Sequence, residues 1–379
     1  MDRIFNIDDL IKVAKRENNT KRSYLYVNPI QGKHIPVSPS LALELFSQMA
    51  AIVEERFEGE TLLVIGFAET ATAIGSAIAY NAENVAFYMN TTRESIPATE
   101  YLFFTESHSH ATEQRLVKTG LEKLLPKIDR IVFAEDEVTT GNTIEKLIDA
   151  IMSNYACDHC KFGIISILNS MPEERIRELR KKQVECGFIH KVPVRYRIHE
   201  IENHAYKPLR TELSFACETN YRELFVDNYW NSRVVCETDS LRSAVRGFVE
   251  TAFSKLDIKG KENILILGTE EFMFPAMLLG SYIEREGHGV RVRFHATTRS
   301  PIEISDDKDY PLNRRAPLYS LYEKNRRTFI YNLCSYDYVI IATDAMPIQS
   351  QGINSLIGAL DEAGNKEIAV VQWGRDNHE

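Results

Sequence analysis

One succession of elements occurs twice along this chain, and the repeat limits the folds that the chain can adopt. In the first copy, the apolar run TLLVIG (61–66) ends at a glycine, a short turn follows, and small residues then recur at helical spacing. The segment ENILILG (262–268) ends and continues in the same way. Chains in which strands alternate with helices form mostly parallel sheets with helices on both faces. We therefore predict an α/β protein built from two duplicated units, each a mostly parallel sheet flanked by helices.

The elements that follow these two segments also correspond. The next strand of each copy ends in the same tripeptide, as VAFYMNTTR (85–93) and VRVRFHATTR (290–299) show. A polar stretch then leads to DRIVFAEDEV (129–138) in the first copy and to DYVIIATDAM (337–346) in the second, and one more strand closes each copy. The same order of elements at similar spacing argues against chance. Ligands of such sheets bind at the carboxyl ends of the strands, so we expect the chemistry there.

The two copies differ where those later strands end. The first copy has three acids, Glu135, Asp136 and Glu137, followed by TTGNT, whereas the second has Thr343 and Asp344 followed by PIQSQG after two more residues. The second copy thus keeps the scaffold without the acidic pair and the Thr-Thr-Gly turn, and we predict that it is degenerate. The expected domains are 1–205 for the first copy, 206–234 for a connecting or hood segment, and 235–379 for the second copy.

Charge and hydropathy exclude several classes of protein. The net charge of −9 argues against a general nucleic-acid binder, which usually carries a basic surface. No apolar run reaches the length of about 18 residues that predicts a membrane span. The N-terminal residues carry charges inside their apolar run and no small-residue cleavage site, so no signal peptide is expected and a cytoplasmic location follows. The CxxC of Cys157 and Cys160 has no second pair nearby, which favours structural cysteines over a metal or redox role.

The stretch IVFAEDEVTTGNT (131–143) combines two chemical properties that rarely adjoin. Its hydroxyl-rich turn precedes a helix expected from about Ile144, and backbone N–H groups at a helix N-terminus favour a phosphate. Gly141 permits a positive φ or close approach of a ligand. Glu135 and Asp136 would repel a phosphate but suit ribose hydroxyls or a cation. The alternative is an ordinary capped helix after a solvated acidic strand end.

The same stretch resembles the phosphoribosyl-pyrophosphate (PRPP) binding motif of type I phosphoribosyltransferases, and the order of elements agrees over roughly residues 38–170. The resemblance implies that Glu135 and Asp136 contact the ribose 2′- and 3′-hydroxyls. It departs from the family at Glu135, where Asp is more usual, and at Glu137, where an apolar residue is common. The residues that the resemblance implies for the 5′-phosphate are Thr139, Thr140, Gly141, Asn142 and Thr143.

The resemblance extends to the pyrophosphate of PRPP. In the family an earlier strand carries a pyrophosphate-binding loop and the next strand ends in a basic residue, which here is Arg93. The family's reaction would use Mg²⁺, held mainly through PRPP, with Glu135 and Asp136 as further candidate ligands. The residues of the implied pyrophosphate loop are Phe67, Ala68, Glu69 and Thr70.

A narrower resemblance covers nearly the whole chain. The segments GKHIPVSP, GFAETATAIG, HSHATEQRL and TTRSP (297–301) are similar to the phosphoribosyltransferases of tellurium-resistance-type operons, which carry a C-terminal TRSP domain. That name matches Thr298, Arg299, Ser300 and Pro301 here. This likeness implies a role in making a nucleoside-like metabolite from an acceptor that is not established.

Three further groups of residues are candidate sites. The segment 105–115 is expected to form a lid over the substrate, with an H-x-H metal site and a solvated loop as alternatives. Lys33 and His34 are candidates for a hood over the acceptor. Thr269, Glu270 and Arg299 are candidates for a second ligand site, or scaffold inherited from the duplication. The lid residues that would contact pyrophosphate or transfer protons are Glu106, His108, His110 and Arg115.

Two classes of function follow from these patterns. The first is a Mg²⁺-dependent phosphoribosyltransferase with PRPP and a small-molecule acceptor as partners. The second is a non-catalytic PRPP- or nucleotide-sensing protein on the same fold. The degenerate second copy is the reason to consider it, because that copy keeps the scaffold without the full motif. An enzyme that runs the reverse pyrophosphorolysis is a third alternative. The sequence leaves open the acceptor and the oligomeric state, with a homodimer as one option.

Overall fold

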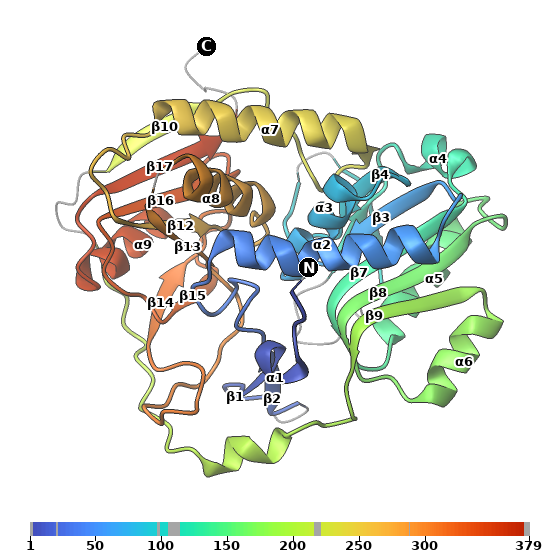
Figure 1. Ribbon diagram of the computed structural model, residues 1–379, viewed down its shortest axis with the longest axis horizontal. Helices are drawn as coiled ribbons and strands as arrows, with labels where there is room; N and C mark the ends of the chain where they lie inside the picture. The colour runs from blue at the N-terminus through green and yellow to red at the C-terminus, as the bar shows by residue number, and fades with distance from the viewer. Residues whose placement is uncertain are drawn as a thin grey trace. The chain divides into compact units, whose positions relative to one another are not determined.

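The computed structural model describes residues 3–19, 22–96, 99–104, 114–215, 221–287 and 289–374 (Figure 1). The chain divides into two compact units, each discontinuous in sequence. The first-copy unit comprises Phe46–Tyr196 and Trp230–Val245, and the second-copy unit comprises Met1–Leu45, Arg197–Tyr229 and Arg246–Glu379. The N-terminal residues therefore fold with the second copy. The domain boundaries at 1–205, 206–234 and 235–379 stay a prediction.

The sheet of the first-copy unit has the strand order β11-β4-β3-β7-β8-β9 (Figure 1). All neighbours in it run parallel except β11, which pairs antiparallel with β4 at the edge. Parallel strands buried on both faces are apolar along their length, and the burial of β3 along its whole length agrees with this. Its strands are β3 (Leu62–Gly66), β4 (Val85–Asn90), β7 (Arg130–Val138), β8 (Lys161–Asn169), β9 (Val184–Lys191) and β11 (Cys236–Glu237).

The sheet of the second-copy unit is parallel throughout, in the order β10-β17-β16-β12-β13. Its strands are β10 (Arg222–Val226), β12 (Asn263–Gly268), β13 (Arg291–Ala296), β16 (Tyr338–Thr343) and β17 (Ile368–Trp373).

The two sheets repeat one topology, which confirms the predicted duplicated α/β fold. The order β4-β3-β7-β8 matches β13-β12-β16-β17 strand for strand. The register matches as well, because Gly66 pairs with Ala134 in one sheet and Gly268 pairs with Ala342 in the other. The place of β9 is taken in the second sheet by β10, which precedes the other strands of that sheet in sequence.

Small residues let the helices lie close to the sheets. In the first-copy unit α3 (Ala71–Asn81) packs on β3, β4 and β7. A Cβ added to Gly75 of this helix would lie 2.7 Å from the Cα of Gly66, so helix and strand approach backbone to backbone. The remaining helices are α1 (Ile7–Leu10), α2 (Pro39–Arg56), α4 (Leu121–Leu124), α5 (Asn142–Asn154), α6 (Glu173–Lys181), α7 (Thr238–Lys255), α8 (Phe274–Glu286) and α9 (Ser350–Glu362), with 3-10 turns η1 (Leu125–Lys127) and η2 (Ile198–Asn203).

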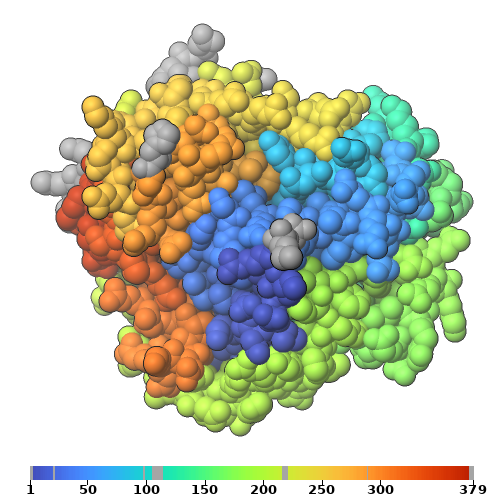
Figure 2. Space-filling view, viewed as in Figure 1, coloured from blue at the N-terminus to red at the C-terminus, as the bar shows by residue number. Residues whose placement is uncertain are grey.

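Antiparallel strand pairs form separate two-stranded sheets. In the second-copy unit the pair β1–β2 joins the segment after β13, since Arg16 bridges to Ile302 and Lys15 O accepts the Glu303 N–H at 2.9 Å. Figure 2 shows the dark-blue N-terminal surface bordering the orange surface of the same unit. The strands of these pairs are β1 (Lys12–Lys15), β2 (Tyr24–Val27), β5 (Tyr101–Phe103), β6 (Arg115–Val117), β14 (Arg315–Tyr319) and β15 (Arg327–Tyr331).

Among the residues that the structure describes, no helix combines the length and the apolar character that a membrane span requires.

Candidate active site

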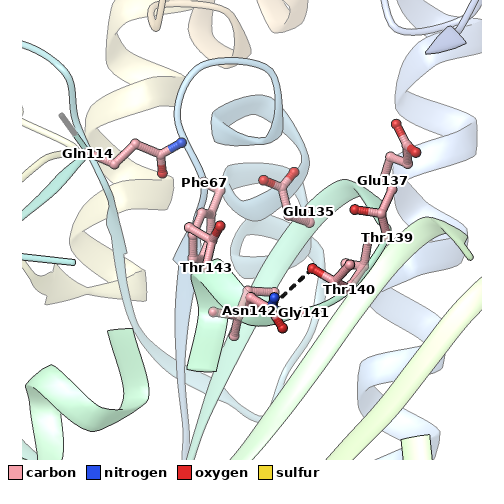
Figure 3. Close-up of a pocket in the computed structure, with 11 residues that line it drawn as sticks. Phe67, Gln114, Glu135, Glu137, Thr139, Thr140, Gly141, Asn142 and Thr143 are labelled. Carbon is pink, nitrogen blue, oxygen red and sulfur yellow. Dashed lines mark hydrogen bonds between the residues drawn. The ribbon is translucent and has the colours of Figure 1, made fainter. Parts of the chain in front are cut away.

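A pocket with a cavity volume of about 120 Å³ opens at the carboxyl end of β7 in the first-copy unit (Figure 3). Its walls come from the end of β7, the turn into α5, the end of β3 and the residue before β6. The structure thus brings Glu135 together with the whole predicted phosphate turn. The lining residues are Phe67, Gln114, Glu135, Glu137, Val138, Thr139, Thr140, Gly141, Asn142, Thr143 and Ile144.

The turn into α5 contains a glycine with a positive φ and leads directly into the helix N-terminus. Gly141 is the N-cap of the helix with φ of 73°, a conformation that favours glycine. The Asn142 N–H donates to Thr140 Oγ1 at 3.4 Å, as the dashed line in Figure 3 marks. Thr140, Asn142 and Thr143 are exposed toward solvent, whereas Gly141 is buried over Met171. The helix N-terminus and its hydroxyls therefore face the pocket, where the dipole favours negative charge.

Three consecutive acidic residues adjoin one another beside this turn. Glu135 Oε2 accepts the Asp136 N–H at 2.9 Å, and Asp136 Oδ1 accepts the Glu137 N–H at 2.9 Å. Burial, followed by the charge of Asp136, holds the pKa of the Glu135 carboxyl well above its usual range. Strand alternation puts Glu135 and Glu137 on the pocket side, and Asp136 adjoins Glu135 without lining the pocket. The sequence marks Glu137 only as an acid where the resembling family usually has an apolar residue.

The loop after β3 is fixed against the end of β7. The Phe67 N–H donates to Ala134 O at 3.1 Å, and the Ala68 N–H donates to Thr91 Oγ1 at 2.8 Å. Thr72 Oγ1 donates to Glu69 O at 3.1 Å at the start of the helix. The peptide between Ala68 and Glu69 is cis. The structure therefore places the predicted pyrophosphate loop, residues 67–70, next to the acidic strand.

Arg93 lies just beyond β4, half-buried, and its positive charge lowers the pKa of Glu135 against the larger effect of burial. The two side chains therefore lie within electrostatic reach of each other. The Arg93 guanidinium therefore adds a positive charge near the Glu135 carboxylate.

The hairpin β5–β6 is attached beside Arg93. Thr92 and Arg115 exchange both backbone hydrogen bonds, at 2.8 and 3.0 Å, and the Arg115 guanidinium lies 5.2 Å from the ring centroid of Tyr101. Gln114, which belongs to the predicted lid segment 105–115 but was not singled out within it, lines the pocket. The other predicted lid residues, Glu106, His108 and His110, lie outside the described residues, and the lid role stays a prediction.

Arg175 of α6 is a further residue that sequence reasoning missed. Its Nε donates to Thr140 O at 3.2 Å, and its Nη2 lies 3.5 Å from Asn142 Oδ1 and binds Glu145 of α5. The i,i+4 spacing of charges along α6 is typical of a solvated helix, and this spacing alone does not show which arginine reaches another element. Arg175 thus links α6 to the turn 139–143.

The predicted hood residues lie in the second-copy unit. Lys33 is buried, and its Nζ donates to Glu270 O at 2.8 Å and to Thr297 O at 2.9 Å. His34 is buried too, with its ring edge-on to Tyr331. The structure thus brings Lys33 together with the predicted second site. The role over the acceptor stays a prediction.

The predicted second site, Thr269 with Glu270 and Arg299, is closely packed. The Glu270 carboxylate pairs with Arg299 Nε at 2.7 Å and is almost fully buried. The Thr269 hydroxyl donates to Thr343 Oγ1 at 2.8 Å. These three residues do meet at the carboxyl ends of β12 and β13.

No group of three or more histidine, cysteine or acidic side chains is placed to hold a metal within the described ranges. The Cys160 thiol donates to Ile128 O at 3.4 Å, and burial raises its pKa to about 11. A thiol in that state is a poor metal ligand.

Comparison with known proteins agrees with this architecture. A family model described as phosphoribosyl transferase matches residues 10–198, and a model of the TRSP domain found C-terminal to that transferase matches residues 236–360. Among curated proteins, none is significantly similar to this chain.

Solved structures similar to the chain include several phosphoribosyltransferases. The adenine phosphoribosyltransferase of Rhodothermus marinus is 15% identical, with 49% of this chain and 96% of that chain covered and a TM-score of 0.33. The adenine enzyme of Giardia lamblia is 10% identical, with 47% and 93% covered and a TM-score of 0.35. The orotate phosphoribosyltransferase of Aeropyrum pernix is 13% identical, with 47% and 87% covered and a TM-score of 0.31.

The two family matches follow one another in the order predicted from the sequence, and together they cover most of the chain. The chain therefore belongs to the family of phosphoribosyltransferases in which a TRSP domain follows the transferase domain.

Proposed function

We propose that this protein is a Mg²⁺-dependent phosphoribosyltransferase, which transfers the ribose 5-phosphate of PRPP to a small-molecule acceptor and releases pyrophosphate. The observation that carries the proposal is one pocket in which Glu135 faces a glycine-capped helix N-terminus. Membership of the phosphoribosyltransferase family supports the same activity. The product would carry the ribose 5-phosphate and would serve the synthesis of a nucleoside-like metabolite in the cytoplasm.

PRPP carries a phosphate, a diol and a pyrophosphate, and the site offers a matching group to each. The 5′-phosphate would lie on residues 139–143, where N–H groups and hydroxyls face the pocket. The ribose hydroxyls would donate to Glu135 and Asp136. The pyrophosphate would lie between residues 67–70 and Arg93. This arrangement removes the conflict between acids and a phosphate site, because the two bind different parts of one ligand.

The reaction breaks the bond between C1 and the pyrophosphate oxygen, and the electron pair leaves with pyrophosphate. Positive charge develops on the ribose ring, and the nearby carboxylates stabilise it electrostatically. Arg93 stabilises the leaving anion by its charge. A nucleophilic atom of the acceptor then bonds to C1 and gives up its proton.

The residues present suit Mg²⁺. The donors are carboxylate oxygens, which this ion prefers, and Glu135 and Asp136 adjoin each other at the end of β7. Mg²⁺ would be held mainly by the oxygens of PRPP, with Glu135 and Asp136 as protein ligands. When bound, it supplies positive charge to the departing pyrophosphate.

A non-catalytic PRPP- or nucleotide-sensing protein is the alternative that one observation favours. The second-copy unit keeps the same strand order without the acidic pair, so this fold is stable without catalytic residues. An enzyme for the reverse pyrophosphorolysis would use the same pocket.

Release of pyrophosphate separates these functions. The full chain is incubated with PRPP, Mg²⁺ and a panel of purine, pyrimidine and other heterocyclic acceptors, and pyrophosphate is measured with a coupled assay. Acceptor-dependent release supports the transferase. Tight PRPP binding without release on any acceptor contradicts it and supports sensing. Formation of PRPP from a nucleotide and pyrophosphate identifies the reverse reaction.

Replacement of Asp136 by asparagine is expected to lower PRPP turnover at least about tenfold, because loss of a charged hydrogen bond costs on the order of 1.5–3 kcal/mol. Steady-state kinetics with PRPP as the varied substrate measure the change. Asp149→Asn, on the exposed side of α5, is the control and should leave the kinetics unchanged. If the Asp136→Asn and wild-type proteins had equal kinetics, Asp136 would not contact PRPP.

Replacement of Arg175 by alanine is expected to raise KM for PRPP roughly three- to tenfold with little change in kcat. Its hydrogen bond to Thr140 O holds the phosphate turn, and a binding contact used equally in ground and transition states affects KM alone. Arg177→Ala is a matched control, because Arg177 lies on the same helix, is 64% exposed and pairs only locally with Glu174. A fall in kcat at constant KM would instead indicate a loss of folded enzyme.

A further inference from the structure

We propose that a segment of the second-copy unit itself occupies the position that corresponds to the PRPP site of the first-copy unit. The protein therefore binds PRPP at one site only. The occupant is the turn between β14 and β15, residues 320–326. The statement about PRPP rests on the proposed function, whereas the identity of the occupant rests on geometry within the second-copy unit.

The turn belongs to a hairpin that both copies possess. Phe103 pairs with Arg115 in β5–β6, and Pro317 pairs with Phe329 in β14–β15, at equal sequence separation. Each hairpin is attached at the same point. Thr92 exchanges backbone hydrogen bonds with Arg115, and Thr298 of the TRSP motif exchanges them with Phe329 at 2.9 and 2.7 Å. The turn 320–326 is therefore the counterpart of the predicted lid segment.

The ribose position is filled by a tyrosine. Asp344 is the counterpart of Asp136, since each lies two residues after the alanine that pairs with the end of the first strand. The Tyr322 hydroxyl donates to Asp344 Oδ1 at 2.7 Å and lies 2.8 Å from Thr269 Oγ1. A protein hydroxyl thus meets Asp344 where a ribose hydroxyl is proposed to meet Asp136.

The loop after the first strand also corresponds between the copies. The Glu270 N–H donates to Thr297 Oγ1 at 3.0 Å, as the Ala68 N–H donates to Thr91 Oγ1. Glu270 therefore stands at the position of Ala68. The first copy has an uncharged side chain there, and the second has a carboxylate.

That carboxylate takes the position of the pyrophosphate. Glu270 pairs with Arg299, the counterpart of Arg93, and with Arg326 of the turn at 2.9 Å. Ser320 Oγ donates to the other carboxylate oxygen at 2.5 Å. The almost fully buried Glu270 carboxylate thus neutralises Arg299. Its counterpart Arg93 is proposed to bind the pyrophosphate of PRPP instead.

The phosphate position is closed by backbone. The N–H of Gln349, the N-cap of α9, donates to Leu321 O at 2.9 Å. A Cβ added to Gly352 in the first turn of α9 would lie 2.2 Å from Ser320 O. The turn therefore rests directly on the helix N-terminus, and no phosphate fits between them. Ser320 and Leu321 are buried, so the contact is part of the folded core.

Hydrogen exchange of the full chain, with and without PRPP and Mg²⁺, tests the proposal. In the free protein, peptides covering 320–326 should exchange slowly, because the Ser320 N–H is bonded to Arg326 O at 2.9 Å and buried. Addition of PRPP should slow exchange around 139–143 and leave 320–326 and 343–352 unchanged. Slowing in the latter segments overturns the single site.

Calorimetry and two variants complete the test. PRPP titration should give one site per chain, and Asp344→Asn should keep its Kd within about twofold while lowering the midpoint of thermal unfolding. Two sites per chain, or an Asp344→Asn variant with weakened PRPP binding, overturn the proposal. Tyr322→Phe should behave like Asp344→Asn. If PRPP does not bind at all, the proposed function fails, whereas fast exchange of 320–326 in the free protein overturns the closed turn independently.

Discussion

Replacement of Glu135 by glutamine should lower PRPP turnover at least about tenfold and yet stabilise the ligand-free protein. The carboxylate lines the pocket, and the charged hydrogen bonds that it is proposed to accept from ribose are worth on the order of 1.5–3 kcal/mol. The same half-buried carboxylate is desolvated and lies next to Asp136, and both effects raise its pKa. Steady-state kinetics measure the first effect, and thermal unfolding in a chelator measures the second.

The pH dependence of the stability effect follows from the direction of the pKa shift. A carboxyl whose pKa is raised by folding binds its proton more tightly in the folded protein. Its contribution to stability is therefore fully present below the unfolded pKa and is lost as pH rises through the folded pKa. Glutamine has no proton to lose. The Glu135→Gln variant should gain stability over wild type as pH rises above about 4.5.

Glu60 supplies a control of opposite sign in the same unit. Its hydrogen bonds with Arg130 and Lys161 lower its pKa, so its stabilisation is present above the unfolded pKa and is lost as pH falls through the folded pKa. Glu60→Gln should therefore destabilise the protein at neutral pH and leave KM for PRPP unchanged. If Glu135→Gln also destabilised at neutral pH, or turned over PRPP normally, its role as a strained site residue would be wrong.

Replacement of Gly141 by valine should raise KM for PRPP at least about tenfold. The residue has φ of 73°, where a β-branched side chain costs on the order of 1–2 kcal/mol, and its Cβ would lie 3.1 Å from Met171 Sδ. The turn must shift to relieve both effects, and a displacement of about 1 Å at a binding group can cost 10²-fold. Kinetics and direct PRPP binding measure the change.

Gly59 provides the matched control for this substitution. It has φ of 75°, and a Cβ there meets nothing within 4 Å. Gly59→Val therefore introduces the same backbone strain in the same unit without touching the phosphate turn. Both variants should lose some stability, but only Gly141→Val should lose PRPP affinity. Equal PRPP affinity in the two variants would place the phosphate elsewhere.

The α/β repeat could be predicted from the sequence, and so could the acidic strand with the turn that follows it. Each of these features is specified by residues that are contiguous in the chain. Apolar runs ending at Gly66 and Gly268 specify strand and turn locally. The register of the parallel strands then brings residues 67–70 to the end of β7, since parallel strands end at one edge of a sheet. The candidate pocket follows from these local signals and one rule of topology.

Tertiary structure alone decided how distant segments complete each unit. β10 takes the outer place beside β17, although it precedes the second copy in sequence. Lys33 donates a hydrogen bond to Glu270, although the two residues are 237 positions apart in sequence. Arg175 reaches Thr140 from a helix whose charge spacing is typical of a solvated helix.

The turn 320–326 shows the same division most clearly. Its sequence, SLYEKNR, contains no pattern which predicts that this segment occupies the position of a ligand. The corresponding segment of the first copy has a different sequence. Only packing puts Tyr322 on Asp344 and Arg326 on Glu270. Periodicity and turn residues determine elements and their order, because those forces act between neighbours in sequence. The occupant of a site is decided by side chains that meet only after the chain has folded.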